Sequence, residues 1–257
     1  MFLRKLLAHP LTRGMAIDDP ATTDLRRRII REKGFLRRIY IEWYSLLGAA
    51  LPSGEGDILE LGSGGGFLSE VIPGVITSEC FPCRGVQLVV DARALPFADA
   101  ALRGIVMTDV FHHVPDPGRF LREAVRCLRP GGVVAMIEPW VTPWSSFVYA
   151  NLHHEPFDPG VPDWTFPSSG PLSGANGAMP WVVFQRDRGR LAADFPALAL
   201  RPIRPLMPLS YVMSGGVSLR SLAPGWSYRA FRFLEESLGR LNRRLAMFAL
   251  ITFERRA

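Results

Sequence analysis

The stretch GDILELGSGGGFLSE, residues 56–70, joins a short apolar run to a loop that contains four glycines. A short apolar run bounded by turn-forming residues is typical of a buried strand. Glycine has no Cβ, so a glycine loop lets the backbone approach a bound molecule closely. The stretch therefore predicts a strand at 57–61, followed by a loop that holds a nucleotide or a nucleotide-like cofactor.

Further short apolar runs follow the glycine loop, and a clear helical segment at 117–129 separates two of them. The runs lie at 75–78, 86–90, 103–107 and 132–137. Near-continuous apolar strands that alternate with helices indicate a parallel sheet covered on both faces. We expect an α/β fold with a doubly wound sheet.

Three kinds of cofactor loop compete for this glycine stretch. A phosphate-binding P-loop needs a lysine after the glycines, where this chain has Phe67 and Leu68. A dinucleotide fingerprint needs a third glycine, which falls on Phe67 or Ser69 according to the frame. The third pattern, acid-x-G-x-G-x-G, resembles the loop of S-adenosylmethionine enzymes, and residues 60–66 fit it at every position.

Acidic residues recur where the other parts of such a site should lie. Glu60 ends the first strand, where its charge can face the cationic end of the cofactor. Glu79 ends the second strand, 17 positions after Gly62, where it can accept hydrogen bonds from ribose hydroxyls. Asp91 follows the third strand, where it can accept from an adenine amino group, and Asp109 follows the fourth.

Four motifs together resemble the class I S-adenosylmethionine-dependent methyltransferases. They are ELGSGGG, DARALPF, DVFHHV and RCLRPGG, all within residues 57–140, and they are most similar to the subgroup that includes quinone-biosynthesis methyltransferases. The resemblance implies a seven-stranded, mostly parallel Rossmann-like sheet whose last strand is antiparallel. Runs at 197–204 and 245–253 would supply its final strands.

The resemblance also implies S-adenosyl-L-methionine as the cofactor and assigns its site. The methionine part would lie against Gly62, Ser63, Gly64 and Gly66, with Glu60 near its charged end. The ribose would be held by Glu79, the adenine by Asp91 and Ala92, and Asp109 would lie near the cofactor.

Histidines supply the candidates for a catalytic role at the methyl group. His153 and His154 precede Glu155 just beyond the fifth strand, at the edge that faces the acceptor in this fold. One of them could act as a general base, and His112 after the fourth strand is a third candidate. A loop that only shapes the pocket stays open as the alternative, and we expect no metal ion.

Composition divides the chain into four regions. Residues 1–50 read as an N-terminal helical extension with one long helix at 20–50, and residues 51–140 as the cofactor-binding core. Residues 141–195 are rich in Pro, Gly, Trp and Ser, which indicates an irregular lid or acceptor-binding insert. Residues 196–257 would complete the sheet and contribute a helix at 228–243.

Charge and hydropathy leave several functions open. The 257 residues carry a net charge of +6 with a pI near 9.7, and no apolar stretch is long enough to cross a bilayer. We expect a cytoplasmic protein whose amphipathic start at residues 2–7 could contact a membrane surface. The sequence does not indicate an oligomeric state.

The sequence favours methyl transfer to a small molecule or to a lipid- or sugar-linked acceptor. An RNA methyltransferase would use the basic segment at 25–38 to contact phosphates. No Asn-Pro-Pro-Tyr motif follows the fourth strand, so a nucleic-acid substrate is disfavoured. A catalytically silent scaffold or membrane-surface protein with this fold is the other alternative.

Overall fold

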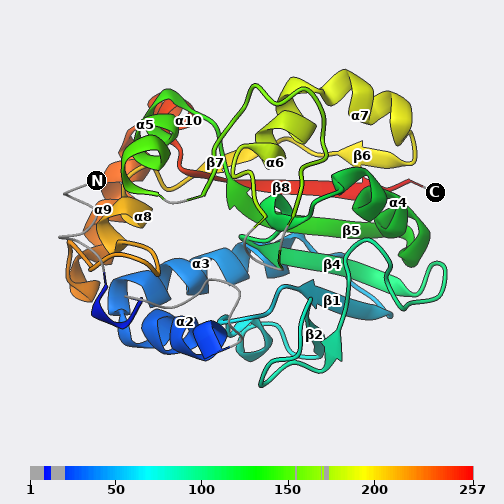
Figure 1. The fold of residues 1–257 in the computed structure, drawn as a ribbon, viewed down its shortest axis with the longest axis horizontal. Helices are drawn as coiled ribbons and strands as arrows, with labels where there is room; N and C mark the ends of the chain where they lie inside the picture. The colour runs from blue at the N-terminus through cyan, green and yellow to red at the C-terminus, as the bar shows by residue number, and fades with distance from the viewer. Residues whose placement is uncertain (1–8, 13–20, 154, 169, 171–173, 257) are drawn as a thin grey trace.

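The computed structural model describes residues 9–12, 21–153, 155–168, 170 and 174–256, and its core is one mixed sheet (Figure 1). Its strands are β1 (Asp57–Leu61), β2 (Val75–Glu79), β3 (Leu88–Val89), β4 (Leu102–Thr108), β5 (Leu128–Pro139), β6 (Leu198–Leu200), β7 (Arg204–Leu206) and β8 (Phe248–Arg255). They lie in the order β3-β2-β1-β4-β5-β8-β6, and β7 also pairs with β8. The first five strands are parallel, and β8 is antiparallel to β5, β6 and β7.

This architecture confirms the expected doubly wound α/β sheet with an antiparallel last strand. The described sheet has eight strands where seven were expected. The additional strand arises because β6 and β7 are two short segments on the same side of β8, and residues 201–203 separate them. The run at 197–204 therefore supplies one edge position of the sheet in two pieces.

Strand side chains alternate between two apolar layers. In β4, Ile105 and Met107 pack in one hydrophobic cluster, and Val106 between them packs in the other. Because successive strand residues point to opposite faces, this division means that both faces of the sheet are covered. The strand sequences are apolar at nearly every position because residues on both faces of the sheet are buried.

Helices from distant parts of the chain cover the two faces. The first cluster contains residues of α4 (Pro117–Cys127), α6 (Met179–Trp181) and α7 (Arg188–Asp194). The second contains residues of α2 (Ala21–Glu32), α3 (Gly34–Ala50), α5 (Pro143–Leu152), α8 (Ser210–Ser214) and α9 (Tyr228–Ser237). In Figure 1, β4 and β5 point to the left, toward the end of the sheet where α5, α8 and α9 gather.

The segment at 20–50 is two helices, so the prediction of one long helix is wrong. Lys33 has ψ of 91°, and α3 restarts at Gly34. The Lys33 ammonium donates to the carbonyl oxygens of Gly216 and Leu219, and Gly34 packs directly against Gly225. These contacts come from residues about 190 positions away, and they hold the chain out of helical geometry.

The C-terminal helix is also interrupted. The predicted helix at 228–243 ends with α9 at Ser237, and a turn at Gly239–Leu241 precedes α10 (Asn242–Leu245). Gly239 has φ of 50°, a left-handed conformation that ends an α-helix. The prediction of a continuous helix therefore missed a glycine stop signal.

The region at 141–195 is more ordered than its composition predicts. Thr142 forms a capping box with Ser145, and Pro143 occupies the first turn of α5, where proline is tolerated. A π-helical segment at Val182–Arg186 joins α6 to α7. Among the described residues of this region, the long irregular part therefore lies between α5 and α6, and the predicted four-region division stays a prediction.

Short 3₁₀ turns complete the described elements, at Pro10–Thr12, Leu68–Glu70, Phe111–His113 and Gly225–Ser227. Within the described ranges, no helix combines the length and the apolar character needed to cross a bilayer. The amphipathic start at residues 2–7 lies outside the described residues.

Candidate active site

The glycine loop is enclosed by its own protein neighbours. A Cβ on Gly62 would lie 2.4 Å from Val110 Cγ2, and a Cβ on Gly66 would lie 2.5 Å from the Tyr44 hydroxyl oxygen. Gly62 also has φ of 68°, a conformation that larger residues rarely adopt. These positions therefore require glycine because of the packing between the loop, the end of β4 and helix α3.

Hydrogen bonds fix the loop to the neighbouring elements. The Ser63 amide donates to the Ser78 carbonyl at 2.8 Å, and the Ser63 hydroxyl donates to Glu60 at 2.6 Å. On the other side, the Arg27 guanidinium of α2 donates to the carbonyl oxygens of Gly64 and Arg84 at 2.8 and 2.9 Å. The loop is thus held between β2 and α2 before any ligand arrives.

Glu60 and Glu79 place two buried carboxylates beside this loop. Both side chains line the cavity described below, and each residue is less than a tenth exposed. Burial raises the pKa of Glu60 to about 7; the hydrogen bond from Ser63 opposes this shift, and the charge of Glu79 adds to it. Glu79 Oε1 accepts from the Cys80 amide at 2.9 Å, while Oε2 has no hydrogen-bond donor among the described residues.

Asp91 and Ala92 follow β3, the strand next to β2, at the carboxyl end of the parallel strands. The Asp91 carboxylate accepts from the Arg93 Nη2 at 2.9 Å and from its Nε, and this hydrogen bonding lowers the pKa of Asp91. Asp91 is exposed, and all three residues line the cavity. The carboxylate keeps lone pairs for a further donor.

Asp109 follows β4 in a strained conformation. Its φ is 62°, which is uncommon outside glycine, and its amide donates to the Ile137 carbonyl at 2.8 Å. Burial raises the pKa of Asp109 to about 7, a positive His112 opposes the shift, and Glu138 and Glu155 increase it. A carboxyl group with this pKa can accept or release a proton at neutral pH.

One cavity of about 610 Å³ connects all the predicted cofactor residues. One side is lined by the glycine loop and the ends of β1 to β4. The other side is lined by α2, α3, α5, α8 and the segment at 215–222. Every candidate cofactor residue borders it: Glu60, Gly62, Ser63, Gly64, Gly66, Glu79, Asp91, Ala92 and Asp109.

Aromatic hydroxyls face the second side of the cavity. Tyr40 of α3, Tyr149 of α5 and Tyr211 of α8 all line it. Burial raises the pKa of each phenol, so these groups stay neutral and can donate hydrogen bonds. Tyr149 is further held by stacking on Phe157, with ring centroids 4.3 Å apart.

The histidine candidates occupy different environments. His112 is 1% exposed and does not line the cavity; its Nδ1 lies 2.8 Å from Glu138 Oε2. His153 lines the cavity, and its Nδ1 accepts the Glu155 amide at 3.3 Å. A backbone N–H only donates, so the proton of a neutral His153 ring lies on Nε2. His154 lies outside the described residues.

His113 and Glu155 were not predicted as site residues, although both line the cavity. Burial and the charge of His112 lower the pKa of His113 to about 3, so its ring is neutral. Burial opposes ionisation of Glu155, but the hydrogen bond and charge of His112 lower its pKa well below the usual range. Burial likewise opposes the His112 imidazolium, while Glu138 and Glu155 raise its pKa well above the usual value.

Comparison with known proteins identifies the core of this site. The family model for a methyltransferase domain matches residues 59–136, which include the glycine loop and the ends of β2 to β4. Residues 59–136 are therefore similar to a methyltransferase domain, in keeping with the class I S-adenosylmethionine-dependent methyltransferases that the sequence motifs resemble. An uncharacterized methyltransferase of Mycobacterium leprae is 26% identical over 151 residues, 57% of this chain and 49% of the relative.

A second relative, from Mycobacterium sp. (strain JLS), is also an uncharacterized methyltransferase. It is 36% identical over 62 residues, 24% of this chain and 25% of its own length. The chain spans about half the length, or less, of these curated methyltransferases. The family model itself matches the segment that carries the glycine loop and Glu79.

Solved structures share the fold of this chain over nearly its whole length. A chain from the complex of the Haloferax volcanii Trm112 methyltransferase activator with a methyltransferase has a TM-score of 0.54. It is 14% identical and covers 95% of this chain and 100% of its own. Geranyl diphosphate C-methyltransferase from Streptomyces coelicolor A3(2) has a TM-score of 0.51 at 15% identity, and covers 98% and 92%.

The residues that line this cavity fit the chemistry of S-adenosylmethionine. The Glu79 side chain is largely buried, and its Oε2 atom lies beside Gly64 of the loop, where it could accept from the hydroxyls of a ribose. Glu60 is a buried acid whose charge a cationic ammonium would stabilise in place of a proton. The acids Glu60, Glu79 and Asp109 together give this half of the cavity a negative character that suits a positively charged molecule.

Proposed function

We propose that this chain transfers a methyl group from S-adenosylmethionine to a small molecule or to a lipid- or sugar-linked acceptor. The observation that carries the proposal is the two-sided cavity. Its first side is lined by a glycine loop and carboxylates, and its second side by tyrosines of three separate helices. A protein that only bound the cofactor would not need the second, aromatic side.

The cofactor half follows from the carboxylates. In this proposal the methionine part of the cofactor is held by the loop at 62–66 and by Glu60. The ribose is held by Glu79, and the adenine by Asp91 and Ala92. Asp109 lines the same cavity and its charge acts on all three tyrosines, so in this proposal the reactive methyl group would lie near it. The strained backbone of Asp109 supports this role, because such strain is retained where the surrounding structure enforces it.

When bound, S-adenosylmethionine would supply a methyl group on a positively charged sulfur. The acceptor lone pair would bond to the methyl carbon while the bond from that carbon to sulfur breaks. The protein's contribution is then alignment of the acceptor and exclusion of water. Tyr149 and Tyr211 can donate hydrogen bonds that orient a polar acceptor atom. A proton lost from the acceptor could be taken by His153, by His154 or by Asp109, whose pKa of about 7 suits proton transfer at neutral pH.

The lining favours an acceptor with an apolar part. Val148, Leu152 and Met247 border the second side with the tyrosines, and Leu222 lines the cavity while half exposed at its mouth. Concave sites lined by aromatic and apolar side chains with few polar groups are typical of small-molecule binding. This lining favours a small or lipid-linked acceptor over a phosphate backbone.

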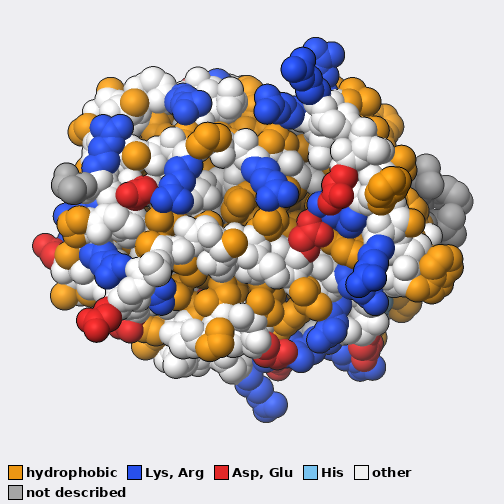
Figure 2. Space-filling view, turned by 180° about the vertical axis from the view of Figure 1, so that it is seen from behind, with side chains coloured by type: hydrophobic (Ala, Val, Ile, Leu, Met, Phe, Trp, Pro, Cys, Tyr) orange, Lys and Arg blue, Asp and Glu red, His pale blue; other side chains and the backbone are white. Residues whose placement is uncertain are grey.

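Three arginines of the basic segment at 25–38 already bind groups of the protein itself, which weakens the RNA alternative. Arg27 holds the glycine loop, Arg28 pairs with Glu32, and Arg31 pairs with Glu70. On the face shown in Figure 2, Lys and Arg side chains of described residues are spread over the surface, and those gathered at the lower right lie beside acidic side chains. A groove for a nucleic-acid backbone would gather them into a track.

Methyl-labelled S-adenosylmethionine tests this proposal. The protein is incubated with the labelled donor and with separate small-molecule, lipid and RNA fractions, and label is followed in each. Label in the small-molecule or lipid fraction supports the proposal. Label that ribonuclease releases favours an RNA substrate, and firm donor binding without transfer to any fraction favours the silent scaffold.

A further inference from the structure

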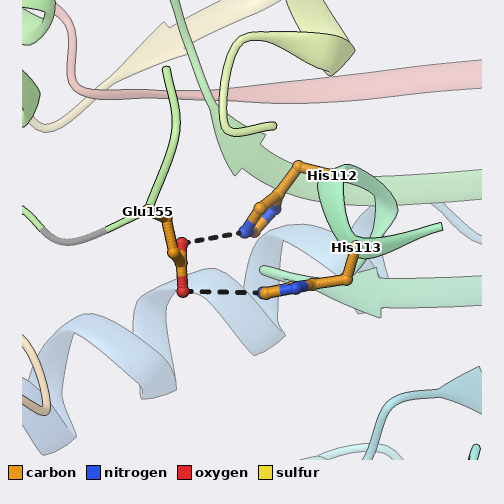
Figure 3. A group of neighbouring side chains, drawn as sticks. All are labelled: His112, His113 and Glu155. Carbon is orange, nitrogen blue, oxygen red and sulfur yellow. Dashed lines mark ion pairs between the residues drawn. The ribbon is translucent and has the colours of Figure 1, made fainter. Parts of the chain in front are cut away.

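Three side chains on two separate segments converge beside the cavity (Figure 3). His112 and His113 follow β4 on the turn Phe111–His113, and Glu155 follows α5. His112 Nε2 lies 3.5 Å from Glu155 Oε2, and His113 Nε2 lies 3.8 Å from Glu155 Oε1. We propose that His112, His113 and Glu155 bind a divalent transition-metal ion of the zinc class, with an open coordination position facing the cavity.

Each imidazole is oriented by an acceptor at its other ring nitrogen. His112 Nδ1 lies 2.8 Å from Glu138 Oε2, and His113 Nδ1 lies 3.2 Å from the Gly174 carbonyl oxygen. Glu138 is itself fixed, because it accepts the Val110 and Phe111 amides at 2.8 Å. Histidines that bind metals commonly donate their second N–H to a carboxylate or a carbonyl in this way.

The tautomer of His113 directs a lone pair at Glu155. A carbonyl oxygen can only accept, so the hydrogen bond to Gly174 puts the proton of the neutral ring on Nδ1. Nε2 then carries a lone pair, and it lies 3.8 Å from Glu155 Oε1. Figure 3 shows the His113 ring and the Glu155 carboxylate pointing toward one another. Two electron-rich groups face each other, and a cation between them would remove the repulsion.

The separations are close to those of a coordination shell. Zinc binds imidazole nitrogen and carboxylate oxygen at about 2.0–2.2 Å, so tetrahedral ligand atoms lie roughly 3.3–3.5 Å apart. The observed N···O separations are 3.5 and 3.8 Å, and the ligand atoms of all three residues lie within 4.8 Å of one another. Small side-chain rotations would therefore complete the shell.

The donor set selects the class of metal. Two imidazole nitrogens and one carboxylate suit Zn²⁺, Co²⁺ or Fe²⁺, whereas Mg²⁺ prefers oxygen ligands. Three protein ligands leave a coordination position open, as in catalytic zinc sites. His113 and Glu155 border the cavity that Tyr149 also lines, so the open position faces this cavity. If the proposed function is correct, that position would hold an oxygen atom of the acceptor.

The competing interpretation is a permanent ion-pair chain. In it, a positively charged His112 bridges Glu138 and Glu155 and needs no metal. The two interpretations differ in what His113 does, since the ion-pair chain gives its Nε2 no partner, while the metal site uses it as a ligand. A variant of His113 therefore distinguishes them without removing the His112 pairs.

The test is a titration of chelator-treated, dialysed protein with Co²⁺, followed by its d–d absorption, and with Zn²⁺ by calorimetry. We expect one ion per chain, binding weakened at least tenfold in His113→Asn and Glu155→Gln, and no effect in the control His9→Asn. Mg²⁺ should not compete. Binding that is absent, or equally strong in all variants, would overturn the proposal.

Two further measurements keep the result interpretable. Titration of each variant with S-adenosylhomocysteine reports whether the cofactor half is intact, independently of the metal. Crystals of the unaltered protein soaked in Zn²⁺ should show an anomalous peak between the three side chains, and a peak elsewhere would contradict the site. Loss of cofactor binding alone would instead count against the proposed function and leave the metal result standing.

Discussion

The Arg27 guanidinium on helix α2 donates to the Gly64 carbonyl oxygen at 2.8 Å, and this bond joins the N-terminal helices to the cofactor loop. The same guanidinium donates to the Arg84 carbonyl oxygen. One side chain therefore joins the glycine loop to the loop that follows β2. The cofactor half of the cavity is thus closed by residues outside the part of the chain that matches the methyltransferase model.

Removing this guanidinium should loosen the loop. We expect Arg27→Ala to weaken S-adenosylhomocysteine binding about tenfold, because a hydrogen bond from a charged donor contributes about 1.5 kcal/mol. Calorimetric titration measures the change. The control is Arg28→Ala, which removes the neighbouring arginine whose partner is Glu32 on the same helix. Equal affinities for both variants would show that the Arg27 contact does not shape the loop.

Glu79 should contribute directly to cofactor affinity. Its side chain is largely buried and its Oε2 atom lies beside the glycine loop, so Glu79→Ala should weaken S-adenosylhomocysteine binding tenfold or more, a cost of about 1.4 kcal/mol or above. Glu70→Ala is the matched control, since Glu70 is exposed and pairs with Arg31. Retention of full affinity in Glu79→Ala would remove the ribose assignment.

Cofactor affinity should depend on pH through Glu60. Burial raises the pKa of Glu60 to about 7, so this carboxyl is mostly protonated at pH 6 and ionised at pH 8. Binding of an ammonium group favours the ionised form, so binding below pH 7 must release a proton. We expect affinity to fall up to about tenfold from pH 8 to pH 6.

Calorimetry in buffers of different ionisation enthalpy measures the released protons. The Glu60→Gln variant should release fewer protons and show a flatter pH profile, although Asp109 also titrates near pH 7. An unchanged profile in Glu60→Gln would assign the titration to another group and contradict the role given to Glu60.

Stability should depend on the carboxylate that anchors the start of helix α8. Glu235 is fully buried and accepts the Leu209 and Ser210 amides at 2.7 and 2.6 Å, and it pairs with Arg232. We expect Glu235→Ala to lower the free energy of unfolding by about 3 kcal/mol, because it leaves two amides and the Ser210 hydroxyl without their acceptor and removes one of the two carboxylate partners of Arg232. Denaturant unfolding measures this loss.

The neighbouring residue provides the control for that variant. Glu236 is exposed, so Glu236→Ala should change the unfolding free energy by less than about 0.5 kcal/mol. Similar unfolding free energies for the two variants would mean that the buried network around Glu235 does not stabilise helix α8, which lines the cavity.

Local signals in the sequence predicted the sheet and the positions of the cofactor loop. The strand at 57–61 has the predicted bounds, because turn-forming residues on both sides of the short apolar run fix where the strand can begin and end. The break at Lys33 could not be predicted, since its cause is a contact with Leu219. Tertiary contacts of this kind override local helix propensity.

The second side of the cavity was also hidden from sequence analysis. Tyr40, Tyr149 and Tyr211 lie on three helices, and no short motif links them. Glu138 offered a signal that was missed, because it is an acid at the end of a parallel strand, like Glu60. The convergence of His113 and Glu155 depends on a chain path of more than 40 residues between them, which spacing alone does not determine.

The central claim is that the carboxyl edge of the parallel strands holds S-adenosylmethionine between the glycine loop and Glu79. Calorimetric titration of the unaltered protein with S-adenosylhomocysteine tests it most directly. We predict saturable binding of one molecule per chain that Glu79→Ala weakens tenfold or more. Absence of binding at millimolar ligand, with the protein folded by circular dichroism, would contradict the claim.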